Sequence, residues 1–440
     1  MPRRHLLAFA ATLTLAFVAQ SCSSDTAPSA ATSSSAVASD STTPEVTATD
    51  ATAVASTDAA TTVPDSATPT TATAATNEPW ALVPDGADFY TPPADLAERA
   101  VGSVIWSQPA APIAGADVSK ILYVSESLAG EPIAVSAMIA VPAQPAPPAG
   151  WPIITWAHGT TGSADICAPS VADQFSVPLP DQVVAVGYIA VATDYEGLGT
   201  PGLHPYLVAD SEARSVLDAA RAATTVPGAS STVFTWGWSQ GGQASIRAGE
   251  LAPAYAPELD VRGAVGFAPL AQVSGIATFG ASSSALAGFW VPMIAGYAEA
   301  YPDTLDAADV LSPAIIDKLD LLETGCTDMY FAEFGAVSGA PGIVDPMTLD
   351  AWATTLSAND NGQEAMTMPL LVVQGSADGV VPQSLNDAFT ADACAAGTTV
   401  QYTVRDGADH GSIVPLSVPE VLSWMTTVLT GTPAPSNCAG

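Results

Sequence analysis

The sequence predicts an α/β fold with a mostly parallel, doubly wound sheet and a helical insertion. From residue 151 onward, short apolar runs alternate with helical stretches. This alternation is typical of βαβ units joined by right-handed crossovers. The rhythm stops after residue 268 and resumes near residue 369, and one apolar run leads into a Gly-x-Ser-x-Gly pattern. Together these observations predict one domain over residues 79–440, with a cap inserted at about 270–367.

The individual strands and helices are expected from local composition. Apolar residues alternate on both sides of a turn at Gly130, which predicts an antiparallel hairpin. Buried strands are expected where β-branched and apolar residues gather, and helices where good helix formers replace them. The expected strands are 121–125, 133–141, 151–157, 183–193, 232–236, 261–268, 369–374 and 399–405. The expected helices are 210–225, capped by Asp210, and 240–251, 383–395 and 415–429.

The insertion carries no strand signal over about a hundred residues and is rich in large apolar side chains. Among them are Phe289, Trp290, Met293, Tyr297, Tyr301, Tyr330, Phe331, Phe334 and Trp352. An insertion of this length between core strands is usually a cap or lid over a site. The alternative is a helical subdomain that packs only for stability.

The N-terminus has the pattern of a targeting segment. Arg3 and Arg4 precede an apolar run at 6–18, which is too short to span a membrane as a mature helix. Residues 1–21 therefore predict a signal peptide. The small residues before Cys22 resemble a bacterial lipoprotein cleavage site, after which Cys22 would be lipidated and tether the protein to the outer face of the membrane. Simple secretion is the alternative, and both place the protein outside the cytoplasm.

Residues 22–78 follow as a linker that consists almost only of Ser, Thr, Ala, Asp, Val and Pro and has no aromatic residue. Such a composition cannot bury enough apolar surface to offset the entropy of ordering, so we expect a disordered tether. The formal net charge of the chain is −34 and becomes 8 − 44 = −36 without residues 1–21. A surface this acidic repels nucleic acid and is compatible with a neutral substrate and a monomer.

Four cysteines remain beyond Cys22, and an even number in an exported chain suggests two disulfides. Of the three possible connectivities we favour Cys167–Cys326 together with Cys394–Cys438, because the second pair would tie the C-terminal tail to the last βαβ segment. The sequence holds neither a Cys-x-x-Cys pair nor a Cys/His cluster, so we expect no metal site.

The strongest chemical signal is Gly237-Trp238-Ser239-Gln240-Gly241. In the nucleophile elbow of α/β-hydrolases, this pattern forms a sharp strand-to-helix turn that presents the serine hydroxyl above the sheet. The glycines are needed because a Cβ at either position would collide with a neighbouring strand or helix. The alternative is a glycine-rich turn with an ordinary capping serine. A base, an acid and a second oxyanion donor at suitable positions decide between the two.

The base is expected to be His410. The chain has four histidines, of which His5 leaves with the signal peptide. In an α/β-hydrolase the triad residues follow the order serine, acid, histidine, which excludes His158 and His204. His410 lies in a loop directly after the strand expected at 399–405, and no cofactor is needed for this chemistry.

The acid is expected to be Asp378, which follows the strand 369–374 at its C-terminal end, where open α/β sheets meet their ligands. Thirty-two residues (410 − 378) separate it from His410, enough for one helix and one strand. Asp409 and Asp406 are the alternatives.

The oxyanion hole is expected to use two backbone N–H groups. One belongs to Gln240, and the other to Thr160 or Gly159 in the loop after the strand 151–157. We expect His158 to hold that loop. Two further residues have structural interpretations: Asp194 either pins the loop beside the oxyanion hole or forms a turn, and Arg247 pairs with a surface carboxylate.

With these motifs in place, the chain from about residue 80 resembles the secretory lipases of the α/β-hydrolase superfamily, the fungal lipase A type. The resemblance is carried by the segments 158–162, 193–199, 237–242, 375–378 and 409–411, together with the insertion. Trp238 is a departure, because many relatives have tyrosine there. The resemblance implies an exported serine carboxylester hydrolase, a lipase or esterase acting on a lipid or other fatty acyl ester at an oil–water interface. The alternatives are a serine peptidase or another acyl hydrolase on the same fold, and a non-catalytic envelope-binding lipoprotein.

Overall fold

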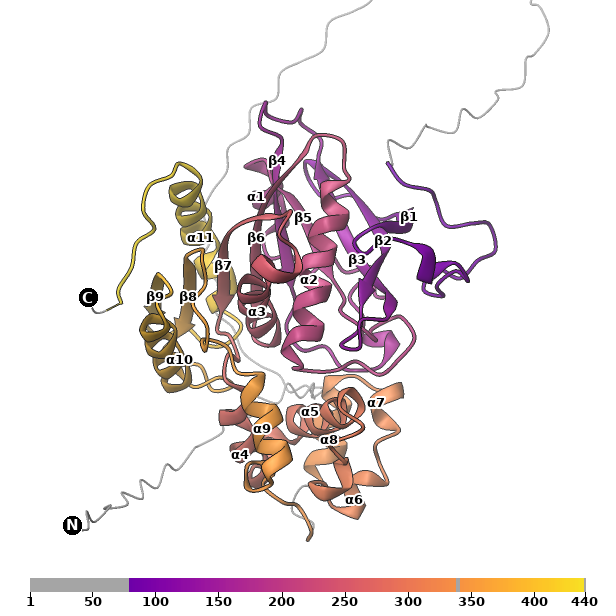
Figure 1. The fold of residues 1–440 in the computed structure, drawn as a ribbon, viewed down its shortest axis with the longest axis vertical. Coiled ribbons are helices and arrows are strands. Elements are labelled where there is room, and N and C mark those ends of the chain that lie inside the picture. Colours follow the sequence, from indigo (N-terminus) through magenta and orange to yellow (C-terminus); the bar gives the residue numbers. More distant parts are fainter. Residues whose placement is uncertain (1–78, 338–340, 439–440) are drawn as a thin grey trace, which may run out of the picture. The chain divides into compact units, whose positions relative to one another are not determined.

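The computed structural model of the chain describes residues 79–337 and 341–438 (Figure 1). The predicted signal peptide at 1–21, the lipidation site Cys22 and the linker at 22–78 lie outside the described residues. In the part of the chain that is described, no helix is both long enough and apolar enough to cross a membrane.

A nine-stranded sheet forms the centre of the domain, in the order β1-β2-β3-β5-β4-β6-β7-β8-β9. The first strands, as far as the β3–β5 pair, are antiparallel, and all pairs from β5 to β9 are parallel. This is the mostly parallel sheet expected from the sequence. The strands are β1 (Val104–Pro109), β2 (Ala116–Glu126), β3 (Pro132–Pro142), β4 (Trp151–Ala157), β5 (Ile189–Thr193), β6 (Ala229–Trp238), β7 (Asp260–Phe267), β8 (Leu370–Gly375) and β9 (Val400–Arg405).

Helices cover both faces of the sheet, which makes it doubly wound (Figure 1). One face packs against α2 (Ala209–Thr224), α3 (Gln240–Tyr255) and α10 (Gln383–Ala396). The other face packs against α1 (Pro180–Ala185) and α11 (Ile413–Leu429). Because both faces are covered, β5 and β8 are buried along their whole length. Continuous apolar strands of this kind are the expected consequence of a parallel sheet.

The cap between β7 and β8 contains no strand in its described residues and gathers below the sheet in Figure 1. Its core is formed by aromatic side chains that are at most 3% exposed, namely Trp290, Tyr297, Tyr330, Phe334 and Trp352. The α-helices of the cap are α4 (Val273–Ser282), α5 (Ala287–Ala300), α6 (Pro313–Ile316), α7 (Leu321–Thr324), α8 (Thr327–Gly335) and α9 (Asp350–Ala358). Short 3-10 helices are η1 (Leu96–Glu98), η2 (Asp165–Cys167), η3 (Ser284–Leu286), η4 (Ala307–Asp309) and η5 (Pro346–Thr348).

The prediction of a strand at 183–193 is wrong for its first half, which belongs to α1 and the turn that follows it. Pro180 occupies the first turn of α1, where its missing N–H costs nothing, and the helix runs to Ala185. Gly187, with φ of 90°, then turns the chain into β5. The buried face of this short helix carries Val183 and Val184, which composition alone does not separate from a strand.

Two further expectations differ from the structure. The edge strand β1 has no counterpart in the sequence analysis, because its six residues include polar positions and end in proline. Asp210 does not cap α2, whose N-cap is Val208. Asp210 instead forms an ion pair with Arg247 at 2.6 Å. Arg247 therefore does pair with a carboxylate, and Glu250 at 3.2 Å is its second partner.

Both disulfides in the structure have the favoured connectivity. Cys167–Cys326 joins η2, in the connection between β4 and β5, to the residue before α8 of the cap. Cys394–Cys438 joins α10 to the C-terminal segment. The first disulfide thus links the connection after β4 to the cap. The second holds the C-terminal segment to α10, beside the edge strand β9.

Candidate active site

Ser239 lies at the tip of a sharp turn between β6 and α3, with φ of 57° and ψ of −118°. The flanking glycines are required by close backbone contacts. A Cβ on Gly237 would lie 1.8 Å from the carbonyl oxygen of Gly241, and a Cβ on Gly241 would lie 2.0 Å from that of Ala157. The tight strand–turn–helix geometry is that of a nucleophile elbow, and not of a simple capping turn.

His410 lies in the loop after β9 and reaches back over the sheet to Ser239. Its Nε2 is 2.9 Å from Ser239 Oγ. The backbone carbonyl of His410 accepts a hydrogen bond from Trp238 Nε1 at 2.8 Å, and the two ring centroids are 5.2 Å apart. Trp238, which precedes the serine, thereby positions the imidazole.

Asp378 follows β8 and meets the other side of the imidazole. Its Oδ2 is 2.7 Å from His410 Nδ1, and the carboxylate side chain is fully buried. Its Oδ1 accepts hydrogen bonds from the backbone N–H groups of Val380 at 2.8 Å and Val381 at 2.9 Å. These donors fix the carboxylate. Because Nδ1–H donates to Asp378, Nε2 is left free to accept the proton of Ser239.

The alternative acids are engaged elsewhere. Asp409 is exposed and accepts hydrogen bonds from Ser412 N and Gly411 N in its own loop. The hydrogen bonds from Ser412 lower the pKa of Asp409 below its usual range. Asp406 accepts a hydrogen bond from Ser376 Oγ at 3.1 Å. Of the three candidates, the structure brings Asp378 into hydrogen-bond contact with the imidazole.

The residues predicted for the oxyanion hole follow Ser239 in the sequence or lie in the loop after β4. Gln240 is the first residue of α3, so its backbone N–H has no acceptor within the helix. Thr160 lines the same pocket as Ser239, and its Oγ1 is 2.8 Å from the hydroxyl of Tyr206. Gly159 is needed for packing, because a Cβ there would lie 2.4 Å from the Trp238 ring.

His158 is structural, as the sequence suggested. The side chain is buried, and burial lowers its pKa to about 4, so the ring is neutral near pH 7. Its backbone carbonyl accepts a hydrogen bond from the Tyr195 hydroxyl at 2.7 Å. This contact holds the start of the loop that carries Thr160.

Asp194 holds the long connection after β4. The residue is 1% exposed; its Oδ2 accepts a hydrogen bond from Ser136 Oγ at 2.7 Å and its Oδ1 one from Ser170 N at 3.1 Å. Burial raises the pKa of Asp194 to about 6. These contacts favour the loop-pinning interpretation over that of a simple turn aspartate.

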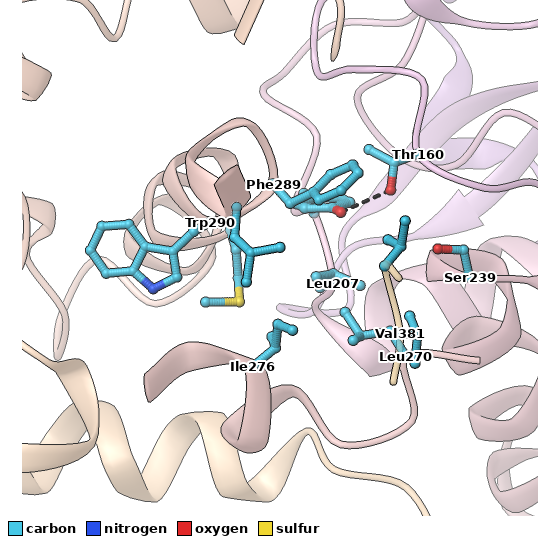
Figure 2. A pocket seen from close by; sticks show the side chains of 12 residues that line it. Thr160, Leu207, Ser239, Leu270, Ile276, Phe289, Trp290 and Val381 are labelled. Carbon is cyan, nitrogen blue, oxygen red and sulfur yellow. Dashed lines mark hydrogen bonds between the residues drawn. The ribbon is translucent and has the colours of Figure 1, made fainter. Parts of the chain in front are cut away.

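A narrow pocket opens beside Ser239, with a cavity volume of about 30 Å³. Figure 2 shows Ser239 and Thr160 on one side of this pocket and Trp290 of the cap on the opposite side. The lining is almost entirely apolar: Thr160, Tyr206, Leu207, Ser239, Leu270, Ile276, Leu286, Phe289, Trp290, Met293, Val380 and Val381. The insertion therefore forms a wall of the pocket in addition to packing on itself.

The structure also adds residues that the sequence analysis missed. Tyr206 contacts Thr160 in the loop after β4, and Glu212 of α2 lies fully buried near Gln240. A signal for Glu212 was present, because Val216, Ala219 and Ala220 follow it at spacings of four, seven and eight residues. This spacing places Glu212 on the buried face of a helix. Within the described residues, no cluster of three or more His, Cys, Asp or Glu side chains could hold a metal ion.

Comparisons with known proteins agree with this architecture. The secretory lipase family profile matches residues 169–437, more than half of the chain. A Mycobacterium tuberculosis protein described as a probable inactive lipase is 25% identical over 382 residues, covering 80% of this chain and 84% of that protein. Lipase 4 of Candida albicans is 27% identical over 401 residues, covering 81% and 83%.

Among solved structures, the closed state of Candida antarctica lipase A superposes with a TM-score of 0.67 at 21% identity. The match covers 81% of this chain and 89% of that one. At this identity the likeness concerns the fold, and the fold is an α/β-hydrolase fold. The family profile, the sheet order and the elbow agree, and the chain belongs to the secretory lipase family of the α/β-hydrolase superfamily.

Proposed function

We propose that the protein is an exported serine hydrolase that cleaves carboxylic esters of fatty acids. The observation that carries the proposal is the pair of hydrogen bonds that joins Asp378 to His410 and His410 to Ser239. Ser239 in turn lines an apolar pocket. Membership of the secretory lipase family supports both the reaction class and export. Anchoring through a lipid on Cys22 belongs to the same proposal and rests on the sequence pattern before that residue.

The mechanism follows from the geometry. Ser239 Oγ attacks the ester carbonyl carbon while His410 Nε2 takes its proton, and the carbonyl oxygen becomes an oxyanion. The N–H groups of Gln240 and Thr160 would stabilise that charge, aided by the positive end of the α3 dipole. His410 then gives the proton to the departing alkoxide, leaving an acyl-enzyme. A water molecule, deprotonated by His410, releases the carboxylic acid and restores Ser239.

The substrate class is inferred from the pocket lining. Its side chains carry no charge, and its polar groups are three hydroxyls and one indole N–H, from Thr160, Tyr206, Ser239 and Trp290. Apolar walls of this kind stabilise an acyl chain through burial, at about 0.8 kcal/mol per buried CH₂. The relatives named as lipases fit this substrate class.

Two alternatives remain testable. A serine peptidase or another acyl hydrolase could use the same triad, but the apolar pocket favours an acyl chain over a peptide. A non-catalytic envelope lipoprotein is the alternative from another class, and the relative described as a probable inactive lipase gives it a precedent in the family. The intact hydrogen bonds between Ser239, His410 and Asp378 favour activity in this chain.

The test is the hydrolysis of p-nitrophenyl esters from acetyl to palmitoyl, with Ser239→Ala as the matched variant. We expect measurable hydrolysis with a preference for acyl chains longer than acetyl, and a loss of about 10⁴-fold or more in the variant. Peptide hydrolysis without ester hydrolysis would favour the peptidase. A folded protein that hydrolyses neither substrate would favour the non-catalytic alternative.

A further inference from the structure

A buried carboxyl group contacts the residue that follows Ser239. Glu212 of α2 is fully buried, and its Oε1 accepts two hydrogen bonds. One comes from Gln240 Nε2 at 2.8 Å, and the other from the backbone N–H of Leu207 at 2.8 Å. The two donors belong to different segments: Gln240 begins α3, and Leu207 lies in the connection between β5 and α2.

The first donor belongs to the residue after the nucleophile. Gln240 Nε2 is also 2.8 Å from His204 Nε2, and His204 Nδ1 is 2.8 Å from the carbonyl oxygen of Glu196. Because burial lowers the pKa of His204 to about 3, the ring carries a single N–H, which Nδ1 donates to that carbonyl. His204 Nε2 is then an acceptor. Both amide hydrogens of Gln240 are therefore bound, one by Glu212 and one by His204.

The second donor belongs to the segment that supports Thr160. Leu207 has a φ of 62°, a conformation that is strained for a leucine and needs fixed neighbours. Its carbonyl oxygen accepts a hydrogen bond from Tyr297 of the cap at 2.9 Å. The preceding residue, Tyr206, contacts Thr160 Oγ1 at 2.8 Å. Glu212 thus holds the backbone of Leu207, and the side chain of the preceding residue, Tyr206, contacts Thr160.

We propose that Glu212 is a positioning residue that holds the two sides of the oxyanion hole, Gln240 and Thr160, in a single geometry. This inference rests on the proposed function, since it assigns a role within the same site. Gln240 Nε2 and Leu207 N both donate to Oε1 of Glu212, and an apolar side chain at position 212 would leave both donors without this acceptor. An oxyanion hole stabilises charge only when its donors are already in place as the charge develops.

The test compares three variants of the full chain on p-nitrophenyl butyrate. Glu212→Leu removes the acceptor, whereas Glu212→Gln keeps a carbonyl oxygen for the same two donors. Glu250→Leu is the matched control, because the Glu250 side chain is also buried and bonds Gly362 N and Arg247, but lies near the far end of α3. Thermal unfolding of each variant reports its stability.

We expect Glu212→Leu to lower kcat by about 10- to 100-fold with KM within about threefold of the wild type. Glu212→Gln is expected to keep kcat within about threefold, and Glu250→Leu to lose stability without losing kcat. A folded Glu212→Leu variant with the wild-type kcat would overturn the inference. So would an equal loss of kcat in Glu250→Leu, because the effect would then be one of stability alone.

If Glu212→Leu does not fold, Tyr206→Phe tests the Thr160 arm of the network and removes a single hydroxyl. We expect its kcat to fall by about 5- to 10-fold at unchanged KM; an unchanged kcat would overturn the inference. Failure of the proposed function has a different signature, since the wild type itself would then hydrolyse no ester. An active wild type with an inactive Ser239→Ala and an unaffected Glu212→Leu would remove this inference alone.

Discussion

Trp238 stands beside the nucleophile in the sequence and against the imidazole in space. Its indole N–H holds the backbone of His410, and its ring fills the space that Gly159 leaves open. Trp238 departs from the tyrosine of many secretory lipases, and the sequence alone does not indicate what its side chain contacts. The hydrogen bond from Trp238 to His410 joins residues 172 positions apart in the sequence, so it depends on how β9 and the loop after it return to the turn at Ser239.

Trp238→Phe is expected to lower kcat by about tenfold with little change in KM, because the imidazole loses one of its anchors but substrate contacts remain. Steady-state kinetics on a soluble ester measure the effect. Trp424→Phe is the matched control, since Trp424 is buried and its Nε1 bonds no group in the described part of the chain. Equal losses of kcat in both variants would show that Trp238 acts through packing and stability only.

Glu212 also predicts a pH dependence of stability. Burial raises its pKa from 4.5 to about 8 in the folded protein. Between those values the folded state holds a proton that the unfolded state has released, so the free energy of unfolding falls as pH rises, by at most ~1.4 kcal/mol per pH unit. Glu212→Gln cannot ionise and lacks this contribution. Urea unfolding at pH 5 and pH 8 should therefore show a stability gain of the variant over the wild type that grows with pH; a gain that is constant or shrinks would contradict it.

The candidate triad could be predicted at the residue scale because order along the chain excludes most options. His158 and His204 precede Ser239, which leaves His410, and Asp378 ends a strand. The supporting residues could not be found in this way. Glu212 and Tyr206 act through hydrogen bonds to residues distant in sequence, and only the folded connection between β5 and α2 brings them together.

At the scale of elements, composition predicted the parallel strands well because burial on both faces gives them continuous apolar runs. It failed where a short helix and a strand share one apolar run, as between Pro180 and Thr193. Proline and glycine supplied the boundaries there, and periodicity over six residues does not distinguish the two structures. The edge strand β1 was missed because it lacks a continuous apolar run: Ser107 and Gln108 are polar, and Pro109 ends the strand.

The two disulfides are expected to separate stability from activity. Removing either by double serine substitution should cost about 2–4 kcal/mol of stability. Cys167–Cys326 ties the connection after β4, which carries Thr160, to the cap, and Thr327 N of the cap also donates to the carbonyl oxygen of Thr161 at 3.2 Å. We therefore expect Cys167→Ser/Cys326→Ser to lower kcat/KM, whereas Cys394→Ser/Cys438→Ser keeps it. Calorimetry and ester kinetics on both variants check this; unchanged kcat/KM without the first disulfide would contradict it.

At the scale of the whole molecule, the formal net charge of −34 is expected to control how closely the protein approaches a charged lipid surface. An anionic surface repels it over roughly a Debye length, about 30 Å at 0.01 M salt and about 8 Å at 0.15 M. Hydrolysis of an ester emulsion coated with phosphatidylserine should therefore rise when salt increases from 10 to 150 mM. An emulsion coated with phosphatidylcholine is the control and should change little, and equal responses of the two would show that charge does not govern access.

The central claim is that Ser239 is the nucleophile activated by His410. The most direct measurement is the reaction of the folded protein with diethyl p-nitrophenyl phosphate, followed by intact mass and peptide mapping. We predict release of one p-nitrophenol per chain, a single diethylphosphoryl group on Ser239, and none in Ser239→Ala. A folded wild-type protein that remains unmodified, or that carries the group on another residue, would contradict the account.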